Sequence, residues 1–191
     1  MSRRGAQLDS GRGTGETRRS STGAGPSSGV ASTLVLVAFL AISFAVAAFG
    51  TLSTLQNVDG WYATAAKAPW SPPNILFGPV WTVLYTLMSV AAWLVWRRRT
   101  EQGSRRALTL YVAQLVLNCL WTPVFFGAYP FIGAPALWIA LAIIVALDIL
   151  VILTLLAFSR HSKPAAALLV PYLAWVLFAT TLNAAVAVLN S

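Results

Sequence analysis

Long runs of apolar residues dominate the chain, and short polar segments separate them. A helix rises about 1.5 Å per residue, so about 20 residues are enough to cross the hydrocarbon core of a bilayer. Each run has at least that length, and none shows the short alternating segments of barrel strands. We therefore predict an all-α membrane protein, a bundle of five transmembrane helices at residues 30–52, 75–96, 107–128, 133–158 and 164–189.

The first part of the chain has a different composition. Residues 1–29 are mostly Gly, Ser, Thr and Arg, and they cannot bury enough apolar surface to offset the entropy of ordering. A cleavable signal peptide would have a shorter polar region and a shorter apolar core than this segment and the run after it. We predict a disordered basic tail at residues 1–29 and a five-helix transmembrane domain at residues 30–191.

Composition and charge support the membrane and exclude nucleic acid. The chain is 58% hydrophobic and only 9% charged, whereas a soluble domain carries roughly a quarter charged residues. The net charge of +8 resides in clusters between apolar runs, with no basic and aromatic face that could follow a phosphate backbone. Membrane lipid is therefore the expected partner.

The positions of lysine and arginine predict the orientation. Twelve of the 13 lie in the tail, in the loop after the second helix or in the loop after the fourth, which share one side of a five-helix topology. Lys67 alone lies on the opposite side. Cytoplasmic loops carry an excess of Lys and Arg, so the N-terminus is expected in the cytoplasm.

Few residues offer conventional catalytic chemistry. Cys119 is the only cysteine, which excludes an intrachain disulfide, and the sequence has no motif for a metal or a nucleotide. His161 lies in a short loop and is expected to be solvated. Asp148, a lone carboxyl within the fourth helix, either has a function there or reaches toward the basic end of the helix.

Unusual residues recur at helical spacing along the second, third and fifth helices. One face of each helix carries large aromatic residues, and the third and fifth also carry amides. These faces are Trp81, Tyr85, Met88, Ala92 and Trp96; Gln114, Asn118, Trp121 and Phe125; and Pro171, Trp175, Ala179 and Asn183. Buried amides need partners, so the faces either join helices or wall a pocket for a flat apolar ligand.

The first loop, expected at residues 53–74, is the longest connection. Pro69, Pro72 and Pro73 prevent a continuous helix there. Trp61 and Trp70 are expected at the rim of the bundle, at the level of the lipid headgroups.

Three segments resemble the TspO/MBR family, the tryptophan-rich sensory proteins or translocator proteins. They are "WYATAAKAPWSPPNILFGPVWTVLY", "QLVLNCLWTPVFFG" and "PYLAWVLFATTLN", and their order and spacing match over about residues 30–190. The resemblance implies a five-helix bundle that forms a homodimer, with a pocket that opens toward the first loop. The expected location is the cell membrane of a bacterium.

The resemblance also implies a ligand and a site. Family members bind porphyrins or haem, so a tetrapyrrole is the candidate ligand, and no cofactor or metal is required. The expected ligand-binding residues are Trp61, Tyr62, Trp81, Asn118, Trp121, Phe125, Trp175 and Ala179, with no catalytic residue among them. Cholesterol is not supported, because the chain ends in "NAAVAVLNS" without an aromatic residue followed by a basic one.

A membrane receptor or sensor for tetrapyrroles is the function we expect. Two alternatives stay open. One is an enzyme that degrades porphyrins in light, in which tryptophans would supply oxidisable rings. The other is a transporter of small hydrophobic ligands.

Overall fold

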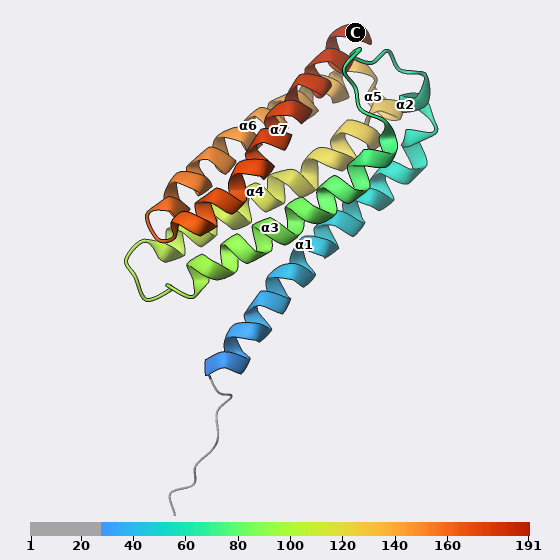
Figure 1. Ribbon diagram of the computed structural model, residues 1–191. Coiled ribbons are helices and arrows are strands. Elements are labelled where there is room, and N and C mark those ends of the chain that lie inside the picture. The colour runs from blue at the N-terminus through green and yellow to red at the C-terminus, as the bar shows by residue number, and fades with distance from the viewer. Residues whose placement is uncertain (1–27) are drawn as a thin grey trace, which may run out of the picture.

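The computed structural model describes residues 28–191, which form a bundle of five long helices (Figure 1). The long helices are α1 (Ser28–Val58), α3 (Phe77–Trp96), α4 (Ser104–Thr122), α6 (Ala134–Ser159) and α7 (Lys163–Leu189). Each coincides over most of its length with one of five segments long and apolar enough to cross a membrane, and residues 28–191 contain no strand. The predicted fold class is confirmed. The tail predicted at residues 1–29 lies almost wholly outside the described residues.

Short helices replace much of the predicted first loop. α1 continues to Val58, and α2 (Trp61–Thr64) follows directly, so the irregular connection is shorter than the expected residues 53–74. The prediction was wrong because residues 53–58 contain neither glycine nor proline, and α1 runs on until it reaches Gly60. A 3₁₀ turn at Asn74–Leu76 then leads into α3.

The third predicted helix is also divided. α4 ends at Thr122, and the segment Pro123–Gly127 forms a π-helical turn before the short helix α5 (Tyr129–Ile132). Pro123 has no backbone N–H, so it cannot donate to the carbonyl four residues earlier. A π turn widens the helix by one residue and changes the direction in which the next side chains point.

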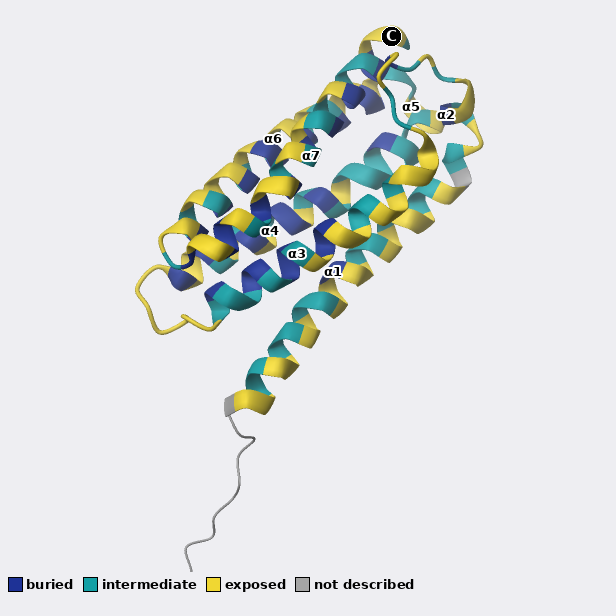
Figure 2. Cartoon of the chain, viewed as in Figure 1, coloured by how far each residue is buried: buried dark blue, intermediate teal, exposed yellow. Residues whose placement is uncertain are grey.

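The core lies between α3, α4, α6 and α7. α6 packs along both α4 and α7, and α3 packs against α7 and α1 (Figure 2). Buried side chains such as Met88, Tyr111, Phe158 and Tyr172 fill the space between these helices. α1 lies at the edge, and only 6% of its most apolar stretch is buried. The exposed apolar faces suit a lipid environment.

Hydrogen bonds between side chains join the helices inside the bundle. Tyr85 donates to Asn118 Oδ1 (2.6 Å), Asn118 Nδ2 donates to Tyr172 Oη (3.2 Å), and Tyr172 donates to Gln114 Oε1 (2.9 Å). A second cluster links Ser89 to Ser43 at 2.9 Å, and Ser43 to Tyr111 at 3.2 Å. Gln114 and Asn118 therefore do face other helices, where they satisfy buried hydroxyl groups.

Asp148 does not reach the basic end of its helix, and a function for its carboxyl stays a prediction. Its side chain is buried between α6 and α7, where Oδ2 accepts a hydrogen bond from Thr180 Oγ1 at 2.8 Å. Within residues 28–191 it forms no ion pair with a loop arginine.

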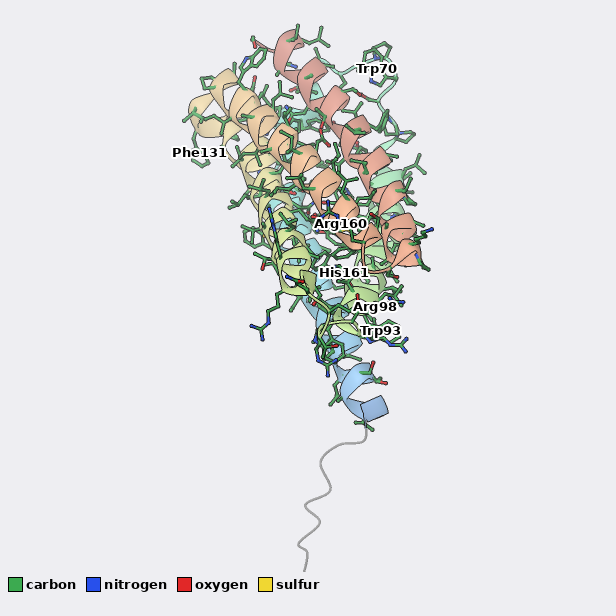
Figure 3. All side chains as sticks on the ribbon, turned by 90° about the vertical axis from the view of Figure 1, so that its left-hand side faces the viewer. Trp70, Trp93, Arg98, Phe131, Arg160 and His161 are labelled. Carbon is green, nitrogen blue, oxygen red and sulfur yellow. The ribbon has the colours of Figure 1, made fainter. Side chains whose placement is uncertain are left out.

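The end of the bundle opposite α2 carries the arginines (Figure 3). Arg97 and Arg99 lie over the rings of Trp93 and Trp96, at 5.0 and 4.1 Å from their centroids. His161 was expected to be solvated, and this was wrong. Its side chain is only 8% exposed, and Nδ1 lies 3.1 Å from Glu101 Oε2. The contact joins the α3–α4 loop to the α6–α7 turn.

Candidate functional site: an aromatic cavity between helices

A cavity of about 490 Å³ lies between α1, α3, α7 and the π turn, at the end of the bundle where α2 lies. Its residues come from seven elements: the four long helices α1, α3, α4 and α7, the short helix α2, the 3₁₀ turn and the π turn. They are Ala47, Gly50, Thr51, Thr54, Leu55, Val58, Tyr62, Asn74, Phe77, Gly78, Trp81, Thr82, Tyr85, Trp121, Thr122, Phe125, Phe126, Trp175, Ala179, Leu182 and Asn183.

Aromatic rings form most of the wall. Trp81 stacks on Tyr85 with ring centroids 5.3 Å apart, and Trp121 stacks on Phe125 at 5.2 Å. Trp175 meets Phe77 edge to face at 5.7 Å. Rings held by one another in this way keep their orientation and present π faces and edges to the space between them.

The polar groups of the wall are few, and most already have partners. Three threonine hydroxyls, those of Thr51, Thr54 and Thr82, donate to carbonyl oxygens of their own helices. Asn183 uses both ends of its amide, since Oδ1 accepts from Trp121 Nε1 (3.0 Å) and Nδ2 donates to the Leu137 carbonyl (3.0 Å).

Trp175 contributes its ring to the wall. Its indole Nε1 is buried and has no acceptor within the described residues, so the ring and not the N–H faces the open space. Within residues 28–191 no charged side chain lines the cavity. The wall is therefore mostly apolar and aromatic.

The helix α2 covers this end of the bundle and contributes Tyr62 to the lining. Lys67 Nζ lies 4.6 Å from the centroid of the Tyr62 ring. Burial removes water from the Tyr62 hydroxyl and raises its pKa above the usual value of 10.0. The phenol is therefore neutral at physiological pH.

Of the eight predicted ligand-binding residues, six line the cavity: Tyr62, Trp81, Trp121, Phe125, Trp175 and Ala179. Trp61 lies behind the lining, stacked on Tyr129 at 3.9 Å and donating to the Phe126 carbonyl at 2.8 Å. Asn118 lies deeper in the bundle, where its side-chain amide is hydrogen-bonded to Tyr85 and Tyr172. Trp70, expected at the rim, is 55% exposed at this end (Figure 3).

The contribution of α1 was missed from the sequence. Four residues of α1 line the cavity at steps of three or four residues: Ala47, Gly50, Thr54 and Val58. A Cβ atom on Gly50 would lie 3.4 Å from Thr122 Oγ1, at van der Waals contact, so α1 lies beside the end of α4 at this point. This spacing was the available signal, but α1 is so uniformly apolar that no single face stands out.

The fold and the cavity together define a class: a five-helix membrane protein with an aromatic cavity between its helices at one end. The model of the TspO/MBR family matches residues 38–189, and the chain belongs to this family. The predicted resemblance is confirmed.

Relatives from all three domains of life are similar in sequence to the chain. The chain is 44% identical to the "Tryptophan-rich protein TspO" of Archaeoglobus fulgidus, over 82% of this chain and 94% of the relative. It is 41% identical to the "Tryptophan-rich sensory protein" of Cereibacter sphaeroides, over 76% of this chain and 86% of the relative. The human "Translocator protein" is 41% identical over 64% of this chain and 70% of its own length.

Proposed function

We propose that this protein is an integral membrane receptor or sensor that binds a tetrapyrrole, a porphyrin or haem, in the aromatic cavity. The observation that carries the proposal is the presence of stacked rings in an uncharged, mostly apolar wall. A flat macrocycle offers π surface to such rings.

Size supports the same ligand class. The volume of about 490 Å³ lies within the roughly 300–1,000 Å³ that is usual for sites of drug-sized molecules. Because the wall has no charge, the carboxylates of a porphyrin would remain at the mouth. Lys67 lies in the loop there and is the one cation of that end in the described chain.

Titration with protoporphyrin IX in the dark tests the proposal. Purified protein in detergent should bind it saturably, as seen by quenching of tryptophan fluorescence and a shift of the porphyrin absorption band. Trp175→Ala removes a ring from the cavity wall and should lower the affinity by about tenfold or more, or at least about 1.4 kcal/mol. The matched control is Trp138→Phe, because Trp138 is exposed on α6 and does not line the cavity. Equal affinity in wild type and Trp175→Ala would contradict the site.

The proposal includes a location, an orientation and an assembly. We propose the cell membrane of a bacterium, with the N-terminus in the cytoplasm, because the arginine-rich loops share one end of the bundle and Lys67 lies at the other. We also propose a homodimer, which the family resemblance implies and for which the exposed apolar helix faces provide surface. Cysteine accessibility at positions 67 and 160 and the mass of the solubilised particle test these two points.

Light-dependent porphyrin breakdown is a second candidate, favoured by the three indole rings that line the cavity, those of Trp81, Trp121 and Trp175. An illuminated complex should then lose porphyrin faster than free porphyrin does, and should form a discrete product. Loss at the rate of free porphyrin would exclude this activity while leaving the binding proposal intact.

A further inference from the structure

The loop between α2 and α3 has few bonds to the rest of the protein. Within residues 65–73, the hydrogen bonds of the described chain are mostly local, such as Ser71 N to the Ala68 carbonyl (3.0 Å). Ala66 is the exception, since its N–H donates to Asn190 Oδ1 (3.0 Å) and its carbonyl accepts from Asn190 Nδ2 (2.9 Å). The Asn190 side chain, at the end of α7, thus makes two hydrogen bonds to the backbone of Ala66, as a residue of a neighbouring strand would.

The Asn190 amide is fully used in this arrangement. Nδ2 also donates to the Val186 carbonyl (2.7 Å), one turn earlier in its own helix. Both N–H groups and the oxygen therefore have partners, and the alternative assignment of the amide atoms would place like groups together. The bond to Val186 holds the amide in position, and the remaining donor and the acceptor bind Ala66.

The loop that contains Ala66 connects two parts of the cavity lining. The loop continues from α2, whose Tyr62 lines the cavity, to Asn74 and Phe77, which line it as well. In Figure 1 the loop passes beside the C-terminal end of α7. A contact at Ala66 therefore ties the cover of the cavity to the helix that carries Trp175, Ala179 and Asn183.

We propose that Asn190 is the latch of the first loop: its paired hydrogen bonds to Ala66 hold the loop closed, and their opening admits ligand at the end of the bundle where α2 lies. Asn190 does not line the cavity and is a positioning residue. The part of this inference that concerns ligand rests on the proposed function, whereas the closure of the loop does not.

Limited proteolysis tests the closure without any ligand. Lys67 is the only trypsin site of the loop, and it directly follows Ala66. Proteolysis of a loop follows the population of its open form, so loss of two hydrogen bonds in Asn190→Ala should speed cleavage after Lys67 by about tenfold. The fragment that begins at Ala68 is measured by mass spectrometry, with cleavage in the 97–106 loop as internal reference.

Two further variants make the result specific. Ser191→Ala is the matched control, because the Ser191 hydroxyl bonds to Trp138 and to its own helix and has no bond to the loop. It should cleave like the wild type. Asn190→Asp keeps the acceptor but replaces both donors by a carboxylate oxygen that faces the Ala66 and Val186 carbonyls, so its cleavage should be at least as fast as that of Asn190→Ala. Equal cleavage after Lys67 in the wild type and Asn190→Ala, with unfolding temperatures alike, would overturn the latch.

Stopped-flow binding of protoporphyrin IX tests the gate. Asn190→Ala should raise both the association and the dissociation rate several-fold, while the equilibrium affinity changes less than either rate. Faster proteolysis with unchanged rates would overturn the gating of ligand and leave the loop contact. If wild type binds no protoporphyrin, the proposed function fails, and the proteolysis still decides the latch.

Discussion

The two ends of the bundle are built on opposite principles. Toward the arginines, four alanines have no exposed surface: Ala91, Ala92, Ala107 and Ala165. Their small side chains permit close helix packing, and the buried ring of Phe158 belongs to the same core cluster. Toward α2, the rings of Trp81, Trp121 and Trp175 each contact a neighbouring tyrosine or phenylalanine at a face or an edge, and a cavity of about 490 Å³ remains between them.

The difference shows how one chain obtains both stability and an empty site. Alternating small and large residues interdigitate and leave few voids, as in the packed end. Several large rings side by side cannot interdigitate and lose dispersion contacts on the open side. The packed end therefore supplies the stability that lets the hollow end persist, and a ligand can restore the missing contacts.

Removing a ring from each end should give the largest contrast. Phe158→Ala leaves a void of roughly 90 Å³ in the packed end, which costs about 2 kcal/mol at about 24 cal/mol per Å³, since in lipid mainly the packing term is lost. Phe77→Ala only enlarges an existing cavity, so its cost should be under about 1 kcal/mol. Unfolding in detergent, followed by near-UV circular dichroism, measures both. Equal losses would mean that the ends do not differ in packing.

Adding atoms should separate the ends in the opposite sense. Ala165→Leu overfills a position with no exposed surface and should cost about 1–3 kcal/mol of stability. Ala179→Leu points into the cavity, so the fold should persist while protoporphyrin affinity falls by about tenfold or more. Parallel measurement of unfolding and of porphyrin binding checks the pair, and normal binding by a folded Ala179→Leu protein would contradict the proposed ligand position.

The amides mark the boundary between the ends. Asn118→Leu breaks bonds to Tyr85 and Tyr172 but does not change the lining, so stability should fall by about 1 kcal/mol and affinity by less than about threefold. Asn183→Leu changes the lining and frees Trp121 Nε1, and should lower both. A tenfold loss of affinity in Asn118→Leu alone would instead make Asn118 a ligand contact, as the family resemblance implies.

The pattern of the sequence predicted the long helices closely, because a bilayer demands about 20 apolar residues for each crossing. α6 and α7 begin and end within one residue of the predicted bounds of 133–158 and 164–189. The breaks were harder to predict. The π turn after Thr122 and the extension of α1 to Val58 depend on local backbone bonds that hydropathy does not record.

The site was predictable where one helix carried the signal and not where several helices met. Five residues that recur at helical spacing along single helices do line the cavity: Trp81, Trp121, Phe125, Trp175 and Ala179. The depth of Asn118 depends on the tyrosines that α3 and α7 bring to it. The pairing of Asn190 with Ala66 joins residues 124 positions apart, and no local pattern could indicate it.

The smallest effect is expected from the loop contact at the packed end. Glu101 bonds to His161 at 3.1 Å and to Arg98 at 3.4 Å, and its side chain is 44% exposed. Pairs this exposed contribute about 0–1 kcal/mol, and salt screens them. Glu101→Gln should therefore lower the unfolding temperature slightly at low salt. Near 0.5 M salt it should have no effect, because the Debye length there is several times shorter than in dilute buffer.

Asn190→Ala is the counterpart at the hollow end, since it breaks uncharged hydrogen bonds whose contribution salt leaves nearly unchanged. Comparing the two variants across a salt series tests whether the ends are closed by different forces. Glu101→Gln should leave both the cleavage after Lys67 and the binding of protoporphyrin as in the wild type. An effect of Glu101→Gln on either would mean that the packed end transmits changes to the cavity, and that the two ends are one mechanical unit.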